Sequence, residues 1–277
     1  MRLRNLASLS LSVLSVLMLS AFLFPIYWMV ITALKPQRAI FANPPEFIPR
    51  NIDWSVWGNI FISNPDVPRY FLNSAIVGIG TTLLTLALAA PAAYGIAHLP
   101  IRGKGLIILV SLSSLMFPVV MLATPLFVIF SRLGLTDSYI GLILANTALA
   151  LPFALVVLRP FFLTLPLQLT EAARIDGCTA WGAFARIMLP LASPGLITAA
   201  IFTFLFGWND LVFALTLTNT DQFRPVTAGL WTFIGVNNTD WNSVMAFSTL
   251  AMLPPLAVFL TAQRYVVAGL TSGAVKQ

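Results

Sequence analysis

The sequence contains very little charge. Only 9% of its 277 residues are Asp, Glu, Lys or Arg, while 58% are hydrophobic, and an ordinary soluble domain carries about 25% charged residues. A soluble globular domain is therefore excluded. The chain is predicted to be a membrane protein, and its length is better counted in membrane spans than in soluble domains.

The residues that most often perform chemistry are also scarce. The chain has one cysteine, Cys178, and one histidine, His98. A single cysteine cannot form an internal disulfide. A single histidine cannot form a metal-ligand cluster, and His98 is the only histidine that could serve as the base for a serine nucleophile. The phosphate-binding pattern GxxxxGK[ST] is absent as well. We therefore expect no enzymatic activity and no bound metal, and we interpret His98 as a packed or interfacial residue near a membrane edge.

Six apolar stretches are long enough for membrane helices, which need roughly 20 residues each. They lie near 7–34, 71–98, 106–130, 141–160, 194–216 and 243–264. The predicted fold class is an all-α membrane protein with six transmembrane helices in one transmembrane domain, 1–277. Small residues in the second stretch predict close helix packing in lipid; they are Gly78, Gly80, Ala87, Ala89 and Ala90.

The first stretch has an alternative interpretation as a secretion signal, because Arg2 and Arg4 precede it. Its apolar run continues to Leu34, however, whereas the core of a signal peptide has about 7–15 residues. A retained first span is favoured.

The distribution of basic residues favours cytoplasmic termini, because short cytoplasmic segments are enriched in Lys and Arg. With six spans, this orientation places nine basic residues inside: Arg2, Arg4, Arg102, Lys104, Arg159, Arg174, Arg186, Arg264 and Lys276. Six lie outside: Lys35, Arg38, Arg50, Arg69, Arg132 and Arg224. The net charge of +6 is thus explained by topology, and nucleic-acid binding is not implied.

Two long segments, 35–69 and 217–242, lie outside in this orientation. The prolines and tryptophans of 35–69 suggest an interfacial cap instead of a disordered tether. Each can be interpreted as a loop that anchors in lipid headgroups or as a docking surface for an extracytoplasmic partner, and the residues alone do not decide between the two.

The cytoplasmic segment 161–193 is too long for a simple turn. Pro166 suits the first turn of a helix, Gly177 suits a left-handed helix end, and Thr179 suits the N-cap of a second helix. The second helix would carry one apolar face, formed by Trp181, Phe184, Ala185 and Met188. This two-faced corner could lie flat on the membrane. Because Glu171 and Asp176 would then meet anionic headgroups, protein docking is the favoured interpretation.

The segment EAARIDGCTAWGAFARIMLPLASPG resembles the EAA loop of ABC importer permease subunits, with Cys178 where alanine is usual. GWNDLVFALTLT, FRPVTAGLWTFIG and QRYVVAGLTSGAVKQ are similar to the carbohydrate-uptake branch, and particularly to its maltose-transporter-like second permease. The resemblance runs from about Phe24 to the C-terminus.

This resemblance implies a type I importer fold with a homologous second permease subunit, two copies of an ATPase and an extracytoplasmic sugar-binding protein. ATP and Mg would be used by the ATPase, and no cofactor would be bound by this chain. By position, the ATPase-coupling residues are Glu171, Ala172, Ala173, Asp176, Gly177, Trp181 and Phe184. Trp181, Phe184 and Met188 are expected to root the corner on the permease's own helices.

A cytoplasmic C-terminal tail is predicted over 265–277. Its last part, GLTSGAVKQ, is too small and polar for the membrane, and alone it would be interpreted as a frayed tail. In the resembling subunits the tail reaches between the two ATPases, which implies a second contact there. The residues concerned are Gly273, Ala274, Val275 and Lys276.

A second candidate site lies within the fifth stretch, where a charge is costly unless it faces protein or water. Trp208, Asn209 and Asp210 could line a sugar path by stacking and hydrogen bonding, or Asp210 could form an interhelix hydrogen bond that supports the fold.

The predicted function is the permease subunit of an ATP-driven carbohydrate importer. Polyols or glycerol phosphates are alternative substrates, and an ion-coupled carrier or channel and a membrane scaffold are rival functions.

Overall fold

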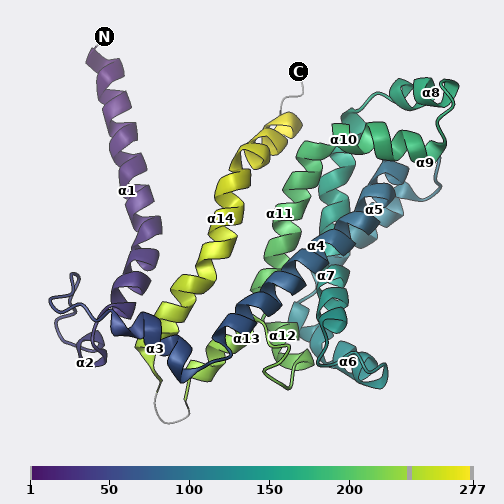
Figure 1. Cartoon of the computed structure of the whole chain (residues 1–277). Helices are drawn as coiled ribbons and strands as arrows, with labels where there is room; N and C mark the ends of the chain where they lie inside the picture. The colour runs from purple at the N-terminus through teal and green to yellow at the C-terminus, as the bar shows by residue number, and fades with distance from the viewer. Residues whose placement is uncertain (1, 236–238, 275–277) are drawn as a thin grey trace. The chain divides into compact units, whose positions relative to one another are not determined.

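The computed structural model describes residues 2–235 and 239–274, with side chains described within 11–235 and 239–263. The predicted tail residues Val275 and Lys276 lie outside the described residues. Of Gly273 and Ala274, only the helical backbone is described. The described chain is mostly helical (Figure 1). Its elements are α1 (Arg2–Ala33), α2 (Gln37–Ile40), α3 (Ser55–Ser63), α4 (Val67–His98), α5 (Lys104–Ser114), α6 (Val119–Arg132), α7 (Tyr139–Thr164), α8 (Gln168–Ile175), α9 (Ala180–Ala183), the π-helix η1 (Phe184–Met188), α10 (Leu189–Leu191), α11 (Ser193–Asn209), α12 (Val212–Leu217), α13 (Val226–Gly229), the 3-10 helix η2 (Leu230–Phe233) and α14 (Trp241–Ala274).

Among the described residues, four helices are long and apolar enough to cross a membrane, and two sharply bent helix pairs bring the number to six if each pair is one span. The four are Leu11–Ala33, Val67–His98, Tyr139–Thr164 and Trp241–Gln263. The pairs are Lys104–Ser114 with Val119–Arg132, bent by 98°, and Ala180–Leu191 with Ser193–Asn209, bent by 78°. The predicted all-helical membrane fold class is confirmed, with four to six candidate spans.

The predicted stretch 106–130 is broken into two helices. Pro118 precedes α6 with extended backbone angles, and α5 ends four residues earlier at Ser114. Proline has no N–H to donate and disfavours the helical conformation of the residue before it, here Phe117. A hydropathy window does not register this break because most of the residues around it are apolar.

One compact unit comprises residues 1–67 and 230–253. The side-chain amide of Asn242 donates a hydrogen bond to the backbone oxygen of Lys35, just beyond the end of α1. The buried Lys35 side chain places Nζ 4.2 Å from the centre of the Trp28 ring. Within this unit the two long segments also meet, since Asn64 Nδ2 donates to Thr232 Oγ1 at 2.9 Å. Such contacts are expected of an ordered segment and not of a disordered tether, which agrees with the interpretation of 35–69 as a cap.

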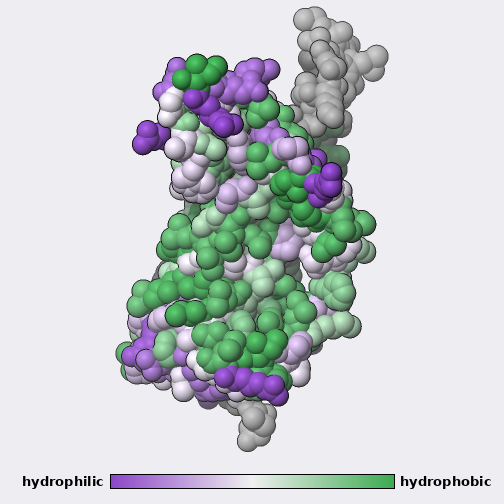
Figure 2. Space-filling view, turned by 90° about the vertical axis from the view of Figure 1, so that its right-hand side faces the viewer, coloured by the Kyte–Doolittle hydropathy of each residue, from purple (hydrophilic) through white to green (hydrophobic). Residues whose placement is uncertain are grey.

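The second unit comprises residues 68–229 and 254–277. Its helices approach closely at small residues, as predicted: a Cβ added to Gly207 of α11 would lie 3.0 Å from Gly78 Cα of α4, and one added to Gly80 would lie 2.4 Å from Ile143 Cδ1. Ala89 and Ala90 are buried, whereas Ala87 is exposed. On the face shown in Figure 2, hydrophobic residues gather in the middle and hydrophilic residues toward the two ends.

A buried asparagine anchors the segment that follows α12. Asn73 of α4 is fully buried, and its Nδ2 donates to the backbone oxygens of Gln222 and Arg224 at 3.0 and 2.9 Å. Its Oδ1 accepts a hydrogen bond from Tyr139 at 2.8 Å. One turn earlier, the Tyr70 hydroxyl donates to Asp221 Oδ1 at 2.8 Å. The start of α4 therefore fixes residues 221–224.

Asp137 fixes the beginning of the same segment. Its Oδ1 accepts the backbone N–H groups of Asn219 and Thr220 at 2.7 and 3.0 Å. Partial burial raises the pKa of this carboxyl, but the hydrogen bonds outweigh burial and hold the pKa below its ordinary value. The carboxylate form is thus the one that orders the segment.

Candidate functional site: the 161–193 corner and a polar pocket

The first half of the corner is a short helix that ends in a left-handed glycine. Gly177 has φ +89°. Its N–H donates to Arg174 O at 3.2 Å, and the Cys178 N–H donates to Ala173 O at 2.9 Å. This pair of bonds is the Schellman arrangement, which satisfies the last carbonyls of a helix. The prediction for Gly177 is confirmed, while α8 begins two residues after Pro166 and not at it.

The second half begins at the predicted N-cap. Thr179 Oγ1 accepts the Gly182 N–H at 3.0 Å, and α9 starts at the next residue. The helix then widens into the π-helix η1 before it bends into α11. Single π-turns are uncommon and recur at functional sites.

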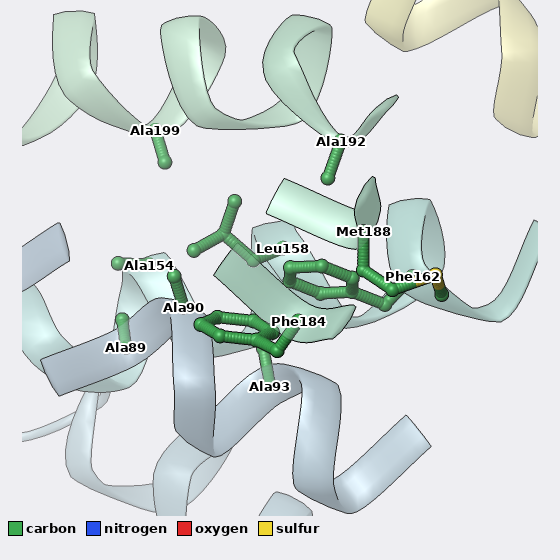
Figure 3. Packing of buried hydrophobic residues seen from close by; sticks show 10 residues of the cluster. All are labelled: Ala89, Ala90, Ala93, Ala154, Leu158, Phe162, Phe184, Met188, Ala192 and Ala199. Carbon is green, nitrogen blue, oxygen red and sulfur yellow. The ribbon is translucent and has the colours of Figure 1, made fainter. Parts of the chain in front are cut away.

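An apolar cluster roots the corner on the long helices of its unit (Figure 3). Phe184 and Met188 are 4% and 0% exposed. They pack against alanines of α4 and α11 and against residues of α7; the cluster comprises Ala89, Ala90, Ala93, Ala154, Leu158, Phe162, Phe184, Met188, Ala192 and Ala199. The prediction that Phe184 and Met188 root the corner is confirmed.

The same prediction is wrong for Trp181, whose side chain is 65% exposed. Trp181 lies in the first turn at the tip of the corner, before the wider π-turn changes the angular register of the following residues. Its ring covers the outer side of Phe184, with 5.1 Å between ring centroids. Assignment by a strict 3.6-residue period therefore placed one residue too many, Trp181, on the buried face.

The exposed surface of the corner combines charge with apolar area. Glu171, Ala172, Asp176 and Gly177 are exposed, whereas Ala173 is 4% exposed and packs inside the corner.

Beside them lies Ile175, which is 86% exposed and was not predicted as a site residue. Its one signal was an isoleucine placed between Arg174 and Asp176 in an otherwise polar segment. Together with the exposed indole of Trp181, it gives the corner an apolar contact surface.

The break at Asp210 has a clear cause. α11 ends at Asn209, and the Asp210 carboxylate accepts the N–H groups of Phe213 and Ala214, both at 3.1 Å, which caps α12. It also accepts a hydrogen bond from Asn146 Nδ2 of α7 at 3.3 Å. Asp210 thus makes the interhelix hydrogen bond that was one of its two predicted roles.

The same groups line a cavity of about 450 Å³. Its polar members are Asn146, Asn209 and Asp210, and its walls are Val119, Leu149, Phe202, Leu205, Phe206, Leu211 and Val212. Asn146 and Phe206 were not predicted as site residues. The signal for Asn146 was a lone amide within the apolar stretch 141–160.

Trp208 does not join this polar group. It is 3% exposed, and its ring stacks on Phe204 with 5.6 Å between centroids and meets Phe71 edge-on at 6.5 Å. It lines a separate, almost wholly apolar cavity. The structure therefore brings Asn209 and Asp210 together with Asn146 and places Trp208 elsewhere. Among the described residues, no group of three or more His, Cys, Asp or Glu side chains could hold a metal ion.

Comparisons with known proteins agree with one another. Residues 86–272 match the family described as "Binding-protein-dependent transport system inner membrane component". The chain is 38% identical to the trehalose transport system permease protein SugB of Mycobacterium tuberculosis, over 96% of each chain. It is 33% identical to the trehalose/maltose transport system permease protein MalG of Thermococcus litoralis, over 95% of this chain and 94% of that protein.

Among solved structures, the chain resembles a subunit of a bacterial ABC transporter involved in the import of the acidic polysaccharide alginate. The TM-score is 0.81 at 21% identity, over 96% of this chain and 98% of that one. A bacterial alginate ABC transporter in complex with an alginate pentasaccharide-bound periplasmic protein matches with a TM-score of 0.67 at 16% identity. At these identities the likeness shows the fold.

Proposed function

The chain belongs to the family of binding-protein-dependent transport system inner membrane components, and from this premise we propose that it is one permease subunit of an ATP-driven sugar importer. As a multi-pass membrane permease it is a non-catalytic subunit. The relatives named above are permeases for trehalose or for trehalose and maltose, which supports a sugar as the substrate.

The observation that carries the proposal is the exposed surface of the 161–193 corner. It presents Glu171, Ile175 and Trp181 outward while Phe184 and Met188 anchor it in the apolar cluster. One exposed ion pair contributes only about 0.2–1 kcal/mol, so Glu171 alone cannot transmit the energy of ATP hydrolysis. We propose that an ATPase subunit holds the corner by shape, with Ile175 and Trp181 supplying the apolar contact.

The other partners follow from the same assignment. A homologous second permease completes the translocation path, two copies of the ATPase use ATP and Mg, and an extracytoplasmic binding protein delivers the sugar. Leu11–Ala33 exposes most of its apolar surface in the isolated chain, and membrane lipid and the second permease would cover it.

Residues 273–276 would form a second ATPase contact. Normal stimulated ATPase activity in an assembly that lacks the last eight residues would contradict that assignment.

The polar cavity favours a neutral substrate. Asn146, Asn209 and Asp210 offer amide and carboxylate groups to sugar hydroxyls, and Phe206 offers a ring face. No Lys or Arg is among the residues described as lining this cavity, whereas a phosphate group is normally recognised by such cations. A sugar or polyol therefore suits this half of the path better than a glycerol phosphate.

Uptake by the complete assembly in proteoliposomes tests the function. We expect a labelled neutral disaccharide to accumulate when ATP is supplied on the ATPase side with the loaded binding protein on the other. A non-hydrolysable ATP analogue should give no accumulation. Uptake driven by an ion gradient without ATP would overturn the proposal in favour of a secondary carrier.

Cys178 provides a test of the orientation. It is the only cysteine in the sequence and is partly exposed beside Gly177. A membrane-impermeant maleimide should label it from the cytoplasmic side of oriented vesicles, and bound ATPase should slow the labelling about tenfold or more by excluding the reagent. A Cys178→Ser variant controls for background. Labelling from the opposite side would contradict cytoplasmic placement of the corner.

A further inference from the structure

The carbonyl of Phe162, in the last turn of α7, lacks its ordinary helical partner. That partner would be the N–H of residue 166, which is Pro166 and has none. The Leu165 N–H donates one hydrogen bond to this oxygen at 3.1 Å, and His98 Nε2 lies 2.8 Å from it. Because a carbonyl oxygen only accepts, Nε2 carries the proton. His98, the last residue of α4, thus supplies the donor that Pro166 removes.

Tyr94 lies one turn before His98 on the same face of α4. Its ring centroid is 5.2 Å from that of His98, 5.7 Å from that of Phe162 and 5.1 Å from that of Phe184. Its hydroxyl lies 3.5 Å from the buried Thr170 Oγ1 in α8. Tyr94 therefore contacts both the segment that enters the corner and the segment that leaves it.

These contacts matter because α4 has no covalent link to the corner. The chain enters the corner from α7 and leaves it into α11, so both of those helices must follow when the corner moves. In the described contacts α4 is joined to the corner through side chains, among them Tyr94, His98 and the alanines that face Phe184 (Figure 3). The opposite end of α4 holds residues 221–224 through Tyr70 and Asn73.

We infer that Tyr94 and His98 are positioning residues that make α4 follow the 161–193 corner, so that closure of the ATPase reaches the 221–224 segment through α4. This inference rests on the proposed function, since it gives the corner a route into a third helix. The tyrosine ring supplies the contact with both arms of the corner, and the histidine hydrogen bond fixes the distance between the ends of α4 and α7. Neither residue contacts substrate or ATP in this role.

The test measures sugar molecules transported per ATP hydrolysed by the reconstituted complete assembly. For His98→Ala we expect this ratio to fall about fivefold, the effect of one lost hydrogen bond, with ATP hydrolysis and melting temperature close to those of the wild type. His98→Gln keeps a side-chain N–H donor and should restore the ratio to within about twofold. Tyr94→Phe keeps the ring contacts and should couple nearly normally, whereas Tyr94→Ala should not.

Ser111→Ala is a control, because this partly exposed hydroxyl donates its described hydrogen bond to Ile107 O within its own helix. An unchanged ratio in both His98→Ala and Tyr94→Ala would overturn the inference. So would a parallel fall in melting temperature, hydrolysis and uptake that leaves the ratio intact, because that pattern indicates a merely structural role. Absence of ATP-driven uptake in the wild-type assembly would instead contradict the proposed function and the inference with it.

Discussion

Replacing Gly177 with valine is expected to reduce sugar uptake by the assembled transporter about tenfold while ATP hydrolysis continues. A Cβ at this position would meet nothing within 4 Å, so steric clash is not the cause. The cost lies in the backbone, since φ is +89° and a left-handed conformation costs an ordinary residue roughly 1–2 kcal/mol. A β-branched side chain is especially unfavourable there.

The chain can avoid this cost by opening the corner, which would break the bonds from Gly177 and Cys178 to the end of α8. The exposed side chains of Ile175 and Trp181 would then lose their common orientation. A change of about 1.4 kcal/mol corresponds to a factor of ten in rate, which sets the expected size of the effect.

Gly177→Asn is the matched control. Asparagine is close to valine in size but tolerates the left-handed conformation. We expect Asn to retain most of the uptake and Val to lose it, measured as uptake and ATP hydrolysis in the same proteoliposomes. Equal losses in both variants would show that the added side chain itself blocks the ATPase, contrary to the backbone argument.

The corner could be predicted in detail because its signals are local. A glycine at a helix end and a threonine three residues before the N–H it accepts each specify one backbone geometry within a few residues. Prediction from these local signals failed where the burial of a side chain depends on tertiary packing. Trp181 was assigned to the buried face by helical periodicity, but the π-turn after it changes the register.

The polar contacts between helices could not be predicted because they join residues far apart in sequence. The bond between Asn146 and Asp210 joins α7 to the end of α11, and the bond from His98 to Phe162 O joins the ends of α4 and α7. The sequence showed that Asp210 needed a polar neighbour but did not show which residue supplies it, and Pro166 was interpreted only as part of the first turn of a helix. The break at Pro118 was hidden for another reason, since hydropathy counts composition and not hydrogen bonds.

Replacing Asp210 with alanine is expected to destabilise the permease by about 2–5 kcal/mol. Alanine removes the cap on α12, which is worth about 0.5–2 kcal/mol, and the hydrogen bond from Asn146, where a bond to a charged group contributes about 1.5–3 kcal/mol. The buried Asn146 amide keeps only its bond to Leu142 O. The Asp210 backbone oxygen, which accepts from Thr227 Oγ1, would shift as α12 frays.

Asp210→Asn separates capping from charge. In the wild type Oδ1 accepts the Phe213 N–H, while Oδ2 accepts the Ala214 N–H and Asn146 Nδ2. Asparagine keeps one of the two acceptor oxygens and with it part of the cap, so thermal unfolding of the purified assembly should be closer to the wild type than that of Asp210→Ala. If capping is the role of Asp210, uptake by the Asn variant should stay within about threefold of the wild type, in line with the few tenths of a kcal/mol by which good caps differ. Normal stability with abolished uptake in Asp210→Asn would show instead that the negative charge acts in the path. The two variants thus decide between the structural and the substrate-binding role of the residue that interrupts the fifth apolar stretch.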